Sequence, residues 1–243
     1  MAKLTDFKVL SFDCYGTLID WETGIRAALA AWRKREELQV SDQELIESFG
    51  QNEWVQEQET PELLYPGILA RVLKRMAAGW GLQASDADAA AFGASVRYWL
   101  AFVDSAPALK YLKQYYQLVI LSNVDRESFS YSNVKLGVEF DHIFTAQDIG
   151  SYKPDPRNFH FMLDKLAKTG IEKTQVLHTA ESLYHDHIPA KKLGLATNCI
   201  YRRHAQKGFG ATRPPTEEVT PDFRFNSMAE FVDAHRAALQ AAT

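Results

Sequence analysis

Cysteine is nearly absent from this chain of 243 residues, which contains only Cys14 and Cys199. Two cysteines do not make the disulfide framework of a small secreted protein, so we expect a reducing, cytoplasmic location. No apolar run approaches the roughly 20 residues that a membrane span requires. The first residues also lack the apolar segment of a signal peptide, so no membrane association is expected.

The chain also lacks a large excess of positive or of negative charge. The chain has 27 Lys and Arg residues against 31 Asp and Glu residues, a net charge of −4, and its basic residues are scattered. This excludes the basic patch by which proteins bind nucleic acids. Hydrophobic residues make up 46% of the chain and charged residues 24%, as is ordinary for a globular protein with a sizeable core.

Short apolar runs alternate with helical patterns near the N-terminus and again after residue 103. The runs cover residues 8–12, 117–121, 142–145, 175–178, 198–201 and 223–225. Such alternation is typical of parallel βαβ units with right-handed crossovers. We therefore predict an α/β fold with a Rossmann-like parallel sheet, and a surface loop over the Gly-, Pro- and Thr-rich residues 205–221.

Residues 21–102 have only helical patterns. Ser41 with Glu44 predicts a capping box, and Ser85 predicts a second N-cap. We expect an all-helical cap domain, residues 20–102, inserted into a catalytic core of residues 1–19 and 103–243. Its first segment, residues 21–25, leaves directly from the loop after the first strand, so we expect it to close over the site.

Polar side chains follow four of the predicted strands, and any one of them alone is a weak signal. In chain order they are Asp13, Ser122, Asn123, Lys153, Glu181 and Asp186. Ligands of open parallel sheets bind beyond the carboxyl ends of the strands. We therefore expect these side chains to gather into one polar cluster with a carboxylate, a counter-charge and hydrogen-bond donors.

The segments FDCYGTL, ILSN, YKPDP and ESLYHD occur in this order. Together they resemble the four motifs of the haloacid dehalogenase superfamily, over roughly residues 8–20 and 117–201, and the helical stretch stands where that family inserts its cap. The resemblance implies a hydrolase in which Asp13 is the nucleophile and forms a covalent ester with a small anionic substrate. Related enzymes are often dimers, which leaves a homodimer as one expectation.

The residue types suit these roles. Lys153 would keep Asp13 ionised, and Asp186 would orient Lys153 or a water molecule. The backbone N–H groups of Cys14 and Tyr15 could face a developing negative charge.

Three side chains, those of Thr17, Ser122 and Asn123, could donate hydrogen bonds to the substrate or to Asp13. Gly16 would allow the sharp turn that follows the strand.

Simpler roles stay open for several of these residues. Thr17 and Asn123 could cap helices. Glu181 could face water, and Cys14 could be a small packing residue. The triplet His178, His185 and His187 suggests a zinc site, although no cysteine pair or fixed helical spacing supports it.

The residue type at position 15 distinguishes between two reactions, phosphate-ester hydrolysis and carbon–halogen cleavage. Phosphatases of the family usually carry an acidic residue at this position, which protonates the leaving alcohol, and tyrosine suits that task poorly at neutral pH. The pattern D-x-Y-G-T-L resembles the type II 2-haloacid dehalogenases, from which halide leaves without a proton. We therefore predict cleavage of the carbon–halogen bond of a small 2-haloacid, with no cofactor required.

Some features depart from those dehalogenases. The stretch 45–58 lacks their cap arginine, Phe159 replaces a tyrosine, and Glu181 and Leu183 replace a serine and an asparagine. An alternative is a Mg²⁺-dependent phosphatase in which Asp13, Glu181 and Asp186 hold the ion. A further alternative is a catalytically idle core that binds an anion or a protein.

Overall fold

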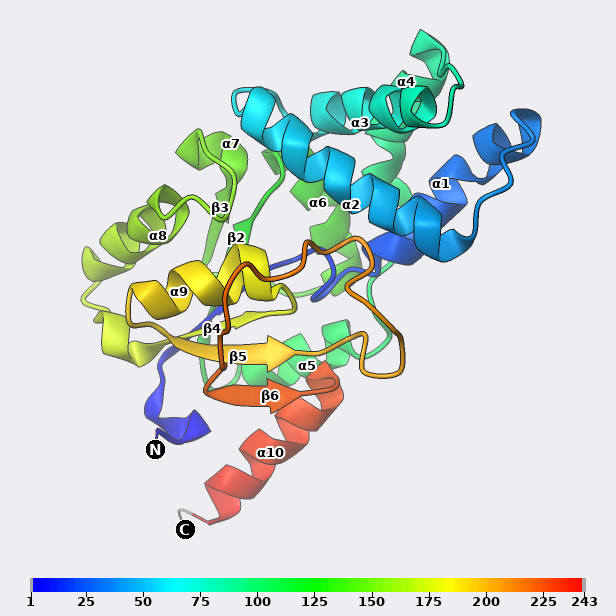
Figure 1. The fold of residues 1–243 in the computed structure, drawn as a ribbon. Helices are drawn as coiled ribbons and strands as arrows, with labels where there is room; N and C mark the ends of the chain where they lie inside the picture. Colours follow the sequence, from blue (N-terminus) through cyan, green and yellow to red (C-terminus); the bar gives the residue numbers. More distant parts are fainter. Residues whose placement is uncertain (1, 242–243) are drawn as a thin grey trace.

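The computed structural model describes residues 2–241, so Met1 and residues 242–243, which the predicted core includes, lie outside the described residues. The described strands form one parallel sheet in the order β3-β2-β1-β4-β5-β6 (Figure 1). They are β1 (Val9–Phe12), β2 (Gln117–Ser122), β3 (His142–Thr145), β4 (Val176–Ala180), β5 (Ala196–Ile200) and β6 (Phe223–Phe225). The predicted α/β class with a Rossmann-like parallel sheet is confirmed.

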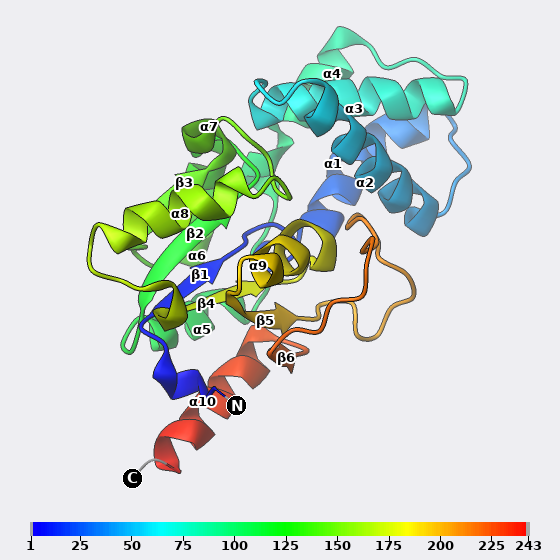
Figure 2. The same cartoon turned by 60° about the vertical axis from the view of Figure 1, so that its left-hand side comes forward.

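Helices cover both faces of this sheet (Figures 1 and 2). One face packs on α8 (Arg157–Ala167) and α9 (Ile188–Lys192), and the other on α5 (Ser105–Leu112), α6 (Arg126–Leu136) and α10 (Met228–Gln240). Alternation along β2 explains this, because Val119 and Leu121 join the core under α8 whereas Leu118 and Ile120 join the opposite core. Short helical turns complete the fold: Leu4–Asp6, α7 (Ala146–Ile149), Lys173–Gln175 and the π-helical turn Leu183–His187.

The strand order reverses at β1. The chain runs from β1 outward through β2 to β3, and then returns to the other side of β1 as β4. Phe12 is in register with Ile120 of β2 and with Thr179 of β4, so three strands end together at this switch point. In an open parallel sheet this is where a ligand crevice forms.

Residues 20–102, called the helical insert below, contain no strand although all of them are described. They form α1 (Trp21–Arg35), α2 (Asp42–Glu59), α3 (Tyr65–Gly79), α4 (Asp86–Gly93) and the short 3₁₀ helix Ala94–Tyr98. The predicted Ser41–Glu44 capping box is present, and Ser85 caps α4 as predicted. Figures 1 and 2 show α1–α4 grouped to one side of the sheet. The division into a core and a cap domain stays a prediction.

Residues 201–222, between β5 and β6, form a strap that reaches the helical insert. The prediction of a surface loop is wrong for residues 210–212, which are buried. Ala211 donates its backbone N–H to Glu22 at 2.9 Å, and Arg203 forms a buried ion pair with the same carboxylate. Gly50 of α2 allows the close approach, because a Cβ atom there would lie 2.0 Å from the Ala211 carbonyl oxygen.

Among the described residues, no helix combines the length and the apolar character needed to cross a bilayer.

Candidate active site

Asp13 lies directly beyond β1, and its backbone N–H continues the sheet by donating to the Thr179 carbonyl at 3.1 Å. Its side chain is buried and accepts two hydrogen bonds, from Lys153 Nζ at 2.9 Å and from Thr17 Oγ1 at 2.7 Å. Burial raises the pKa of Asp13 above its ordinary value, while Lys153 and Thr17 act in the opposite direction. The two donors therefore fix the orientation of the carboxylate at the carboxyl end of the central strand.

A tight turn brings Thr17 back to Asp13. Gly16 adopts the left-handed conformation with φ +84°, and a Cβ atom there would approach the Trp21 indole nitrogen to 2.9 Å. The carbonyl group of Cys14 accepts the N–H groups of both Leu18 and Ile19. Glycine is required at this position because an L side chain would be strained and would collide with Trp21.

Lys153 connects the carboxylates of two strand ends. Its Nζ donates to Asp13 at 2.9 Å, to Asp186 at 2.7 Å and to the Leu121 carbonyl at 3.0 Å. Burial alone would lower the pKa of Lys153, but the two carboxylates raise it above its usual value, so the ammonium group stays charged. Asn123 holds the backbone of Lys153 at both its N–H (2.6 Å) and its C=O (3.0 Å).

The π-helical turn Leu183–His187 positions Asp186. One oxygen of Asp186 contacts Lys153 and lies 3.0 Å from His178 Nε2, and the other oxygen is buried without a partner among the described residues. Burial would raise the pKa of Asp186, but Lys153 and His178 hold it below its usual range. Asp186 is therefore the carboxylate that stays ionised most firmly.

Tyr15 is turned away from Asp13. Its hydroxyl group lies 2.9 Å from Ser132 Oγ of α6, and its ring packs against Tyr65 and Trp99 with centroid distances of 6.3 and 5.6 Å. Burial raises the pKa of Tyr15 well above its ordinary value. Tyr15 thus forms part of the site wall and is poorly suited to exchange protons.

Other predicted site residues lie close by, but not all of them reach the cavity. Cys14 is fully buried, and burial together with the charge of Asp13 raises the pKa of its thiol well above the ordinary value. Ser122 is also buried, and its hydroxyl group has no partner among the described residues. Asn123 lines the cavity, whereas Ser122 and Thr17 are not among its lining residues.

The predicted magnesium set, Asp13, Glu181 and Asp186, is not arranged to hold an ion. Glu181 is turned to Thr212, whose hydroxyl group donates to it at 2.8 Å, and the oxygens of Asp13 are taken by Lys153 and Thr17. Among residues 2–241, no three His, Cys, Asp or Glu side chains are grouped as metal ligands. These donors therefore do not fit a resident Mg²⁺ ion.

The three histidines that suggested a zinc site are also not grouped around one point. His178 bonds to Ser11 and Asp186, while His187 bonds to the carbonyl of Ala180. His185 lies 3.1 Å from Ser182 Oγ. Burial lowers the pKa of His185 and of His187 to about 4, so both are neutral hydrogen-bonding groups at physiological pH.

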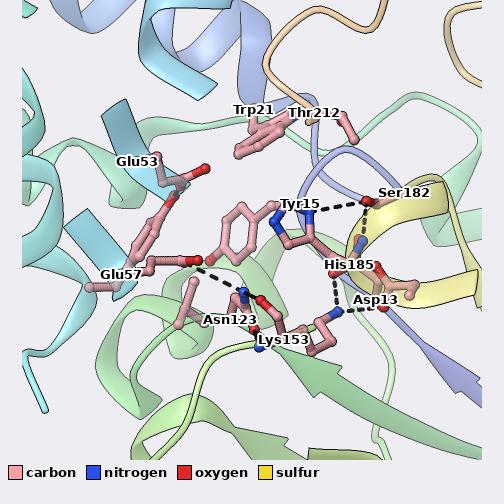
Figure 3. Close-up of a pocket in the computed structure, with 13 residues that line it drawn as sticks. Asp13, Tyr15, Trp21, Glu53, Glu57, Asn123, Lys153, Ser182, His185 and Thr212 are labelled. Atoms are coloured by element: carbon pink, nitrogen blue, oxygen red, sulfur yellow. Dashed lines mark hydrogen bonds and ion pairs between the residues drawn. The ribbon is translucent and has the colours of Figure 1, made fainter. Parts of the chain in front are cut away.

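A cavity of about 50 Å³ opens beside Asp13, enough for a small ligand or a few water molecules. Lys153, Asn123 and Trp21 line it (Figure 3), and so does Asp186. Trp21 belongs to the segment that was expected to close over the nucleophile, and its side chain lines the cavity beside Asp13.

Two acidic residues that the sequence analysis missed line the far wall of this cavity: Glu53 and Glu57 of α2. Both are buried, on the face of α2 that also carries the apolar residues Leu45 and Phe49. That position is the signal that could have identified them, since an acid on the apolar stripe of a helix is rarely a solvated surface residue.

The comparisons with known proteins agree with this fold. A family model described as haloacid dehalogenase-like hydrolase matches residues 7–180, and no curated protein matches the chain. Similar solved structures include the defluorinating L-2-haloacid dehalogenase Rha0230, with a TM-score of 0.74 and 20% identity over 97% of this chain and 99% of that chain. The L-2-haloacid dehalogenase of Xanthobacter autotrophicus has a TM-score of 0.75 and 18% identity over 95% and 98% of the two chains.

The Bacillus subtilis HAD-hydrolase YfnB, bound to magnesium, is also similar, with a TM-score of 0.74 and 16% identity over 93% and 97% of the two chains. At such identities these neighbours show the fold alone. The family model, however, spans most of the chain. The protein therefore belongs to the haloacid dehalogenase-like hydrolases.

Proposed function

We propose that this hydrolase cleaves the carbon–halogen bond of a small 2-haloacid, with Asp13 as the nucleophile. In this proposal residues 1–19 and 103–243 form the catalytic core and residues 20–102 the cap domain. The observation that carries it is the placement of two side chains: Asp13 lines the cavity beside Lys153, whereas Tyr15 directs its hydroxyl group to α6. A departing halide needs no proton donor at position 15.

The first step is a displacement at carbon. An oxygen of Asp13 attacks the carbon that bears the halogen, the carbon–halogen bond breaks, and halide leaves with the bonding pair. The backbone N–H groups of Cys14 and Tyr15 have no acceptor among the described residues. They and the charge of Lys153 are suited to hold the carboxylate of the substrate.

The second step is hydrolysis of the ester. Water, oriented by a hydrogen bond to Asp186 on the cavity lining, attacks the carboxyl carbon of Asp13. Lys153 and Thr17, which already contact the two oxygens of Asp13, stabilise the charge of the tetrahedral intermediate. The intermediate then releases a 2-hydroxy acid, whose new hydroxyl group receives one proton of the water; the second proton passes to solvent, and the Asp13 carboxylate is regenerated.

The test is a panel of 2-chloro- and 2-fluorocarboxylic acids with halide release as the signal, run with and without EDTA. We expect release that is insensitive to EDTA and falls by about 1,000-fold or more in Asp13→Asn, because the covalent step is lost. Asp164→Asn, on the exposed side of α8, serves as the matched control and should keep its activity.

The same panel contains p-nitrophenyl phosphate. Phosphate release that requires Mg²⁺ and stops with EDTA, without halide release, would replace the proposal by the phosphatase alternative. No turnover of either substrate class would point to the idle core.

A further inference from the structure

The wall opposite the nucleophile is made by two carboxyl groups, one helical turn apart on α2. Glu53 accepts a hydrogen bond from the Tyr65 hydroxyl at 2.5 Å, and Glu57 accepts one from Asn123 at 3.5 Å. The second oxygen of each carboxyl group has no partner among the described residues. Figure 3 shows both side chains across the cavity from Asp13 and Lys153.

This wall faces a site that already carries excess negative charge. Lys153 is the one Lys or Arg side chain among the described residues that line the cavity, and Asp13 and Asp186 both contact it. Two further buried carboxylates would leave several negative charges without a counter-ion, which is costly at low dielectric. The two carboxyl groups of α2 are therefore expected to stay protonated.

The pKa values of Glu53 and Glu57 agree with this expectation. Burial raises the pKa of Glu53 to about 8, with the charge of Asp13 acting in the same direction and the hydrogen bond from Tyr65 against it. Burial and the neighbouring Glu53 raise the pKa of Glu57 well above its ordinary value. Both shifts favour the protonated form of the carboxyl group, which can donate a hydrogen bond.

The direction in which Asp13 attacks the substrate indicates a role for the hydrogen-bond donors Glu53 and Glu57. Displacement at a saturated carbon requires the leaving group to depart on the side away from the nucleophile. Opposite Asp13 that side is α2, where no arginine lines the cavity within the described residues. We propose, on the basis of the proposed function, that Glu53 and Glu57 form the leaving-group subsite and donate hydrogen bonds to the departing halide. Both protons stay on the glutamates, and the halide leaves as an anion.

Other ionisable groups face the pair and bear on any pH dependence: Asp13, Tyr15, Tyr65, Tyr152, Lys153, His185 and Asp186. The pKa of each tyrosine is raised and that of His185 is lowered to about 4, in each case by burial. Glu181, in a neighbouring cavity, also has its pKa raised by burial to about 8. A separate variant at Glu181 is therefore part of the test.

The experiment measures halide binding without turnover. Chloride and fluoride are titrated into the protein while tryptophan fluorescence is followed, since Trp21 lines the cavity. Wild-type protein should bind halide at neutral pH and lose up to about tenfold in affinity for each pH unit above 8, as Glu53 ionises. Glu53→Gln keeps an N–H donor that does not ionise, so its binding should persist at alkaline pH.

Three further variants complete the test. Glu57→Gln exchanges the carboxyl donor for an amide N–H donor, so its halide affinity at neutral pH should fall, but by less than tenfold. Glu181→Gln should keep the alkaline loss, and so should Glu59→Gln, an exposed control on the same helix. Halide binding that tightens with pH, that is absent at every pH, or that falls more than tenfold in the glutamine variants at neutral pH would overturn the subsite.

Infrared spectroscopy gives a second measurement on wild-type protein alone. The carbonyl band of protonated carboxyl groups should be present at neutral pH and decrease as the pH rises through 8. Its absence at neutral pH would contradict the proposal even if the glutamine variants failed to fold. Neither measurement needs turnover. A failed halide-release panel would therefore contradict the proposed function, whereas halide binding and the infrared band would still test the subsite.

Discussion

Tyr15 stands two positions after Asp13, yet its hydroxyl group contacts Ser132 and its ring contacts Tyr65 and Trp99. We expect Tyr15→Phe to keep halide release within a few-fold of wild type. Loss of one partly buried hydrogen bond should cost about 1 kcal/mol of unfolding free energy. Kinetics together with urea unfolding check both numbers, and a loss of turnover beyond 100-fold would show that the hydroxyl group takes part in the reaction.

Single residues also show how far the sequence could predict the site. Asp13, Lys153 and Asp186 follow buried strands in a recognisable order, and strand ends converge in a parallel sheet, so their meeting could be predicted. Glu53 and Glu57 could not be placed in the same way. Their contact with the site depends on how α2 is tilted over the sheet, which no local pattern in the sequence determines.

At the scale of elements, α2 packs directly on the backbone of the strap at Gly50. A Cβ atom there would lie 2.0 Å from the Ala211 carbonyl oxygen, so Gly50→Ala should push α2 and the strap apart. We expect a loss of about 2 kcal/mol in unfolding free energy and a higher KM, because the same helix carries Glu53 and Glu57. Thermal unfolding and halide-release kinetics measure these two effects.

Gly79, the last residue of α3, is the matched control. It is exposed, and a Cβ atom there would meet nothing within 4 Å. Gly79→Ala should therefore be neutral or stabilise the protein by up to about 1 kcal/mol, since alanine is the better helix former. Equal effects of the two substitutions would contradict the packing explanation.

The elements themselves were largely predictable. Residues 142–145 and 223–225 are strands with the predicted bounds, and α1–α4 occupy the stretch predicted as helical. The central strands β1, β2 and β4 could be recognised because buried parallel strands are short apolar runs. The π-helical turn Leu183–His187 was not predicted, because its histidine and aspartate side chains have no apolar periodicity and its shape depends on the contacts of Asp186 and His178.

At the scale of the whole molecule, the ion pair between Glu22 and Arg203 joins the helical insert to the strap. Both side chains are buried, so Arg203→Met would leave Glu22 with only the longer ion pair to Arg26 at 3.8 Å. We expect it to cost about 3–5 kcal/mol, and Glu22→Gln in the same protein should recover part of the loss by removing the charge. Chemical unfolding of both variants provides the measurement.

The exposed pair of Arg236 and Asp233 is a suitable comparison. Arg236→Met should change the unfolding free energy by less than about 1 kcal/mol, because water screens this pair. If Arg203→Met were equally mild, the ion pair would not be what fastens the strap to the insert.

The burial of part of the strap was the feature of the architecture that the sequence predicted least well. Residues 205–221 have the composition of a solvated loop, and most of them are exposed. Only Gly210 and Gly50 hint at a close approach, and the two lie too far apart in the chain for a local pattern to relate them. Burial of residues 210–212 depends on a long-range fit that becomes visible only once the chain is folded.

The strap has a consequence for motion. Thr212 donates to Glu181 of the core, while its neighbour Ala211 donates to Glu22 of the insert. A fluctuation that lifts α1 and α2 from the sheet would therefore also pull on the segment that covers Glu181. Thr212 itself lines the cavity beside Asp13, so we expect a displacement of the insert to reach the cavity through residues 211–212.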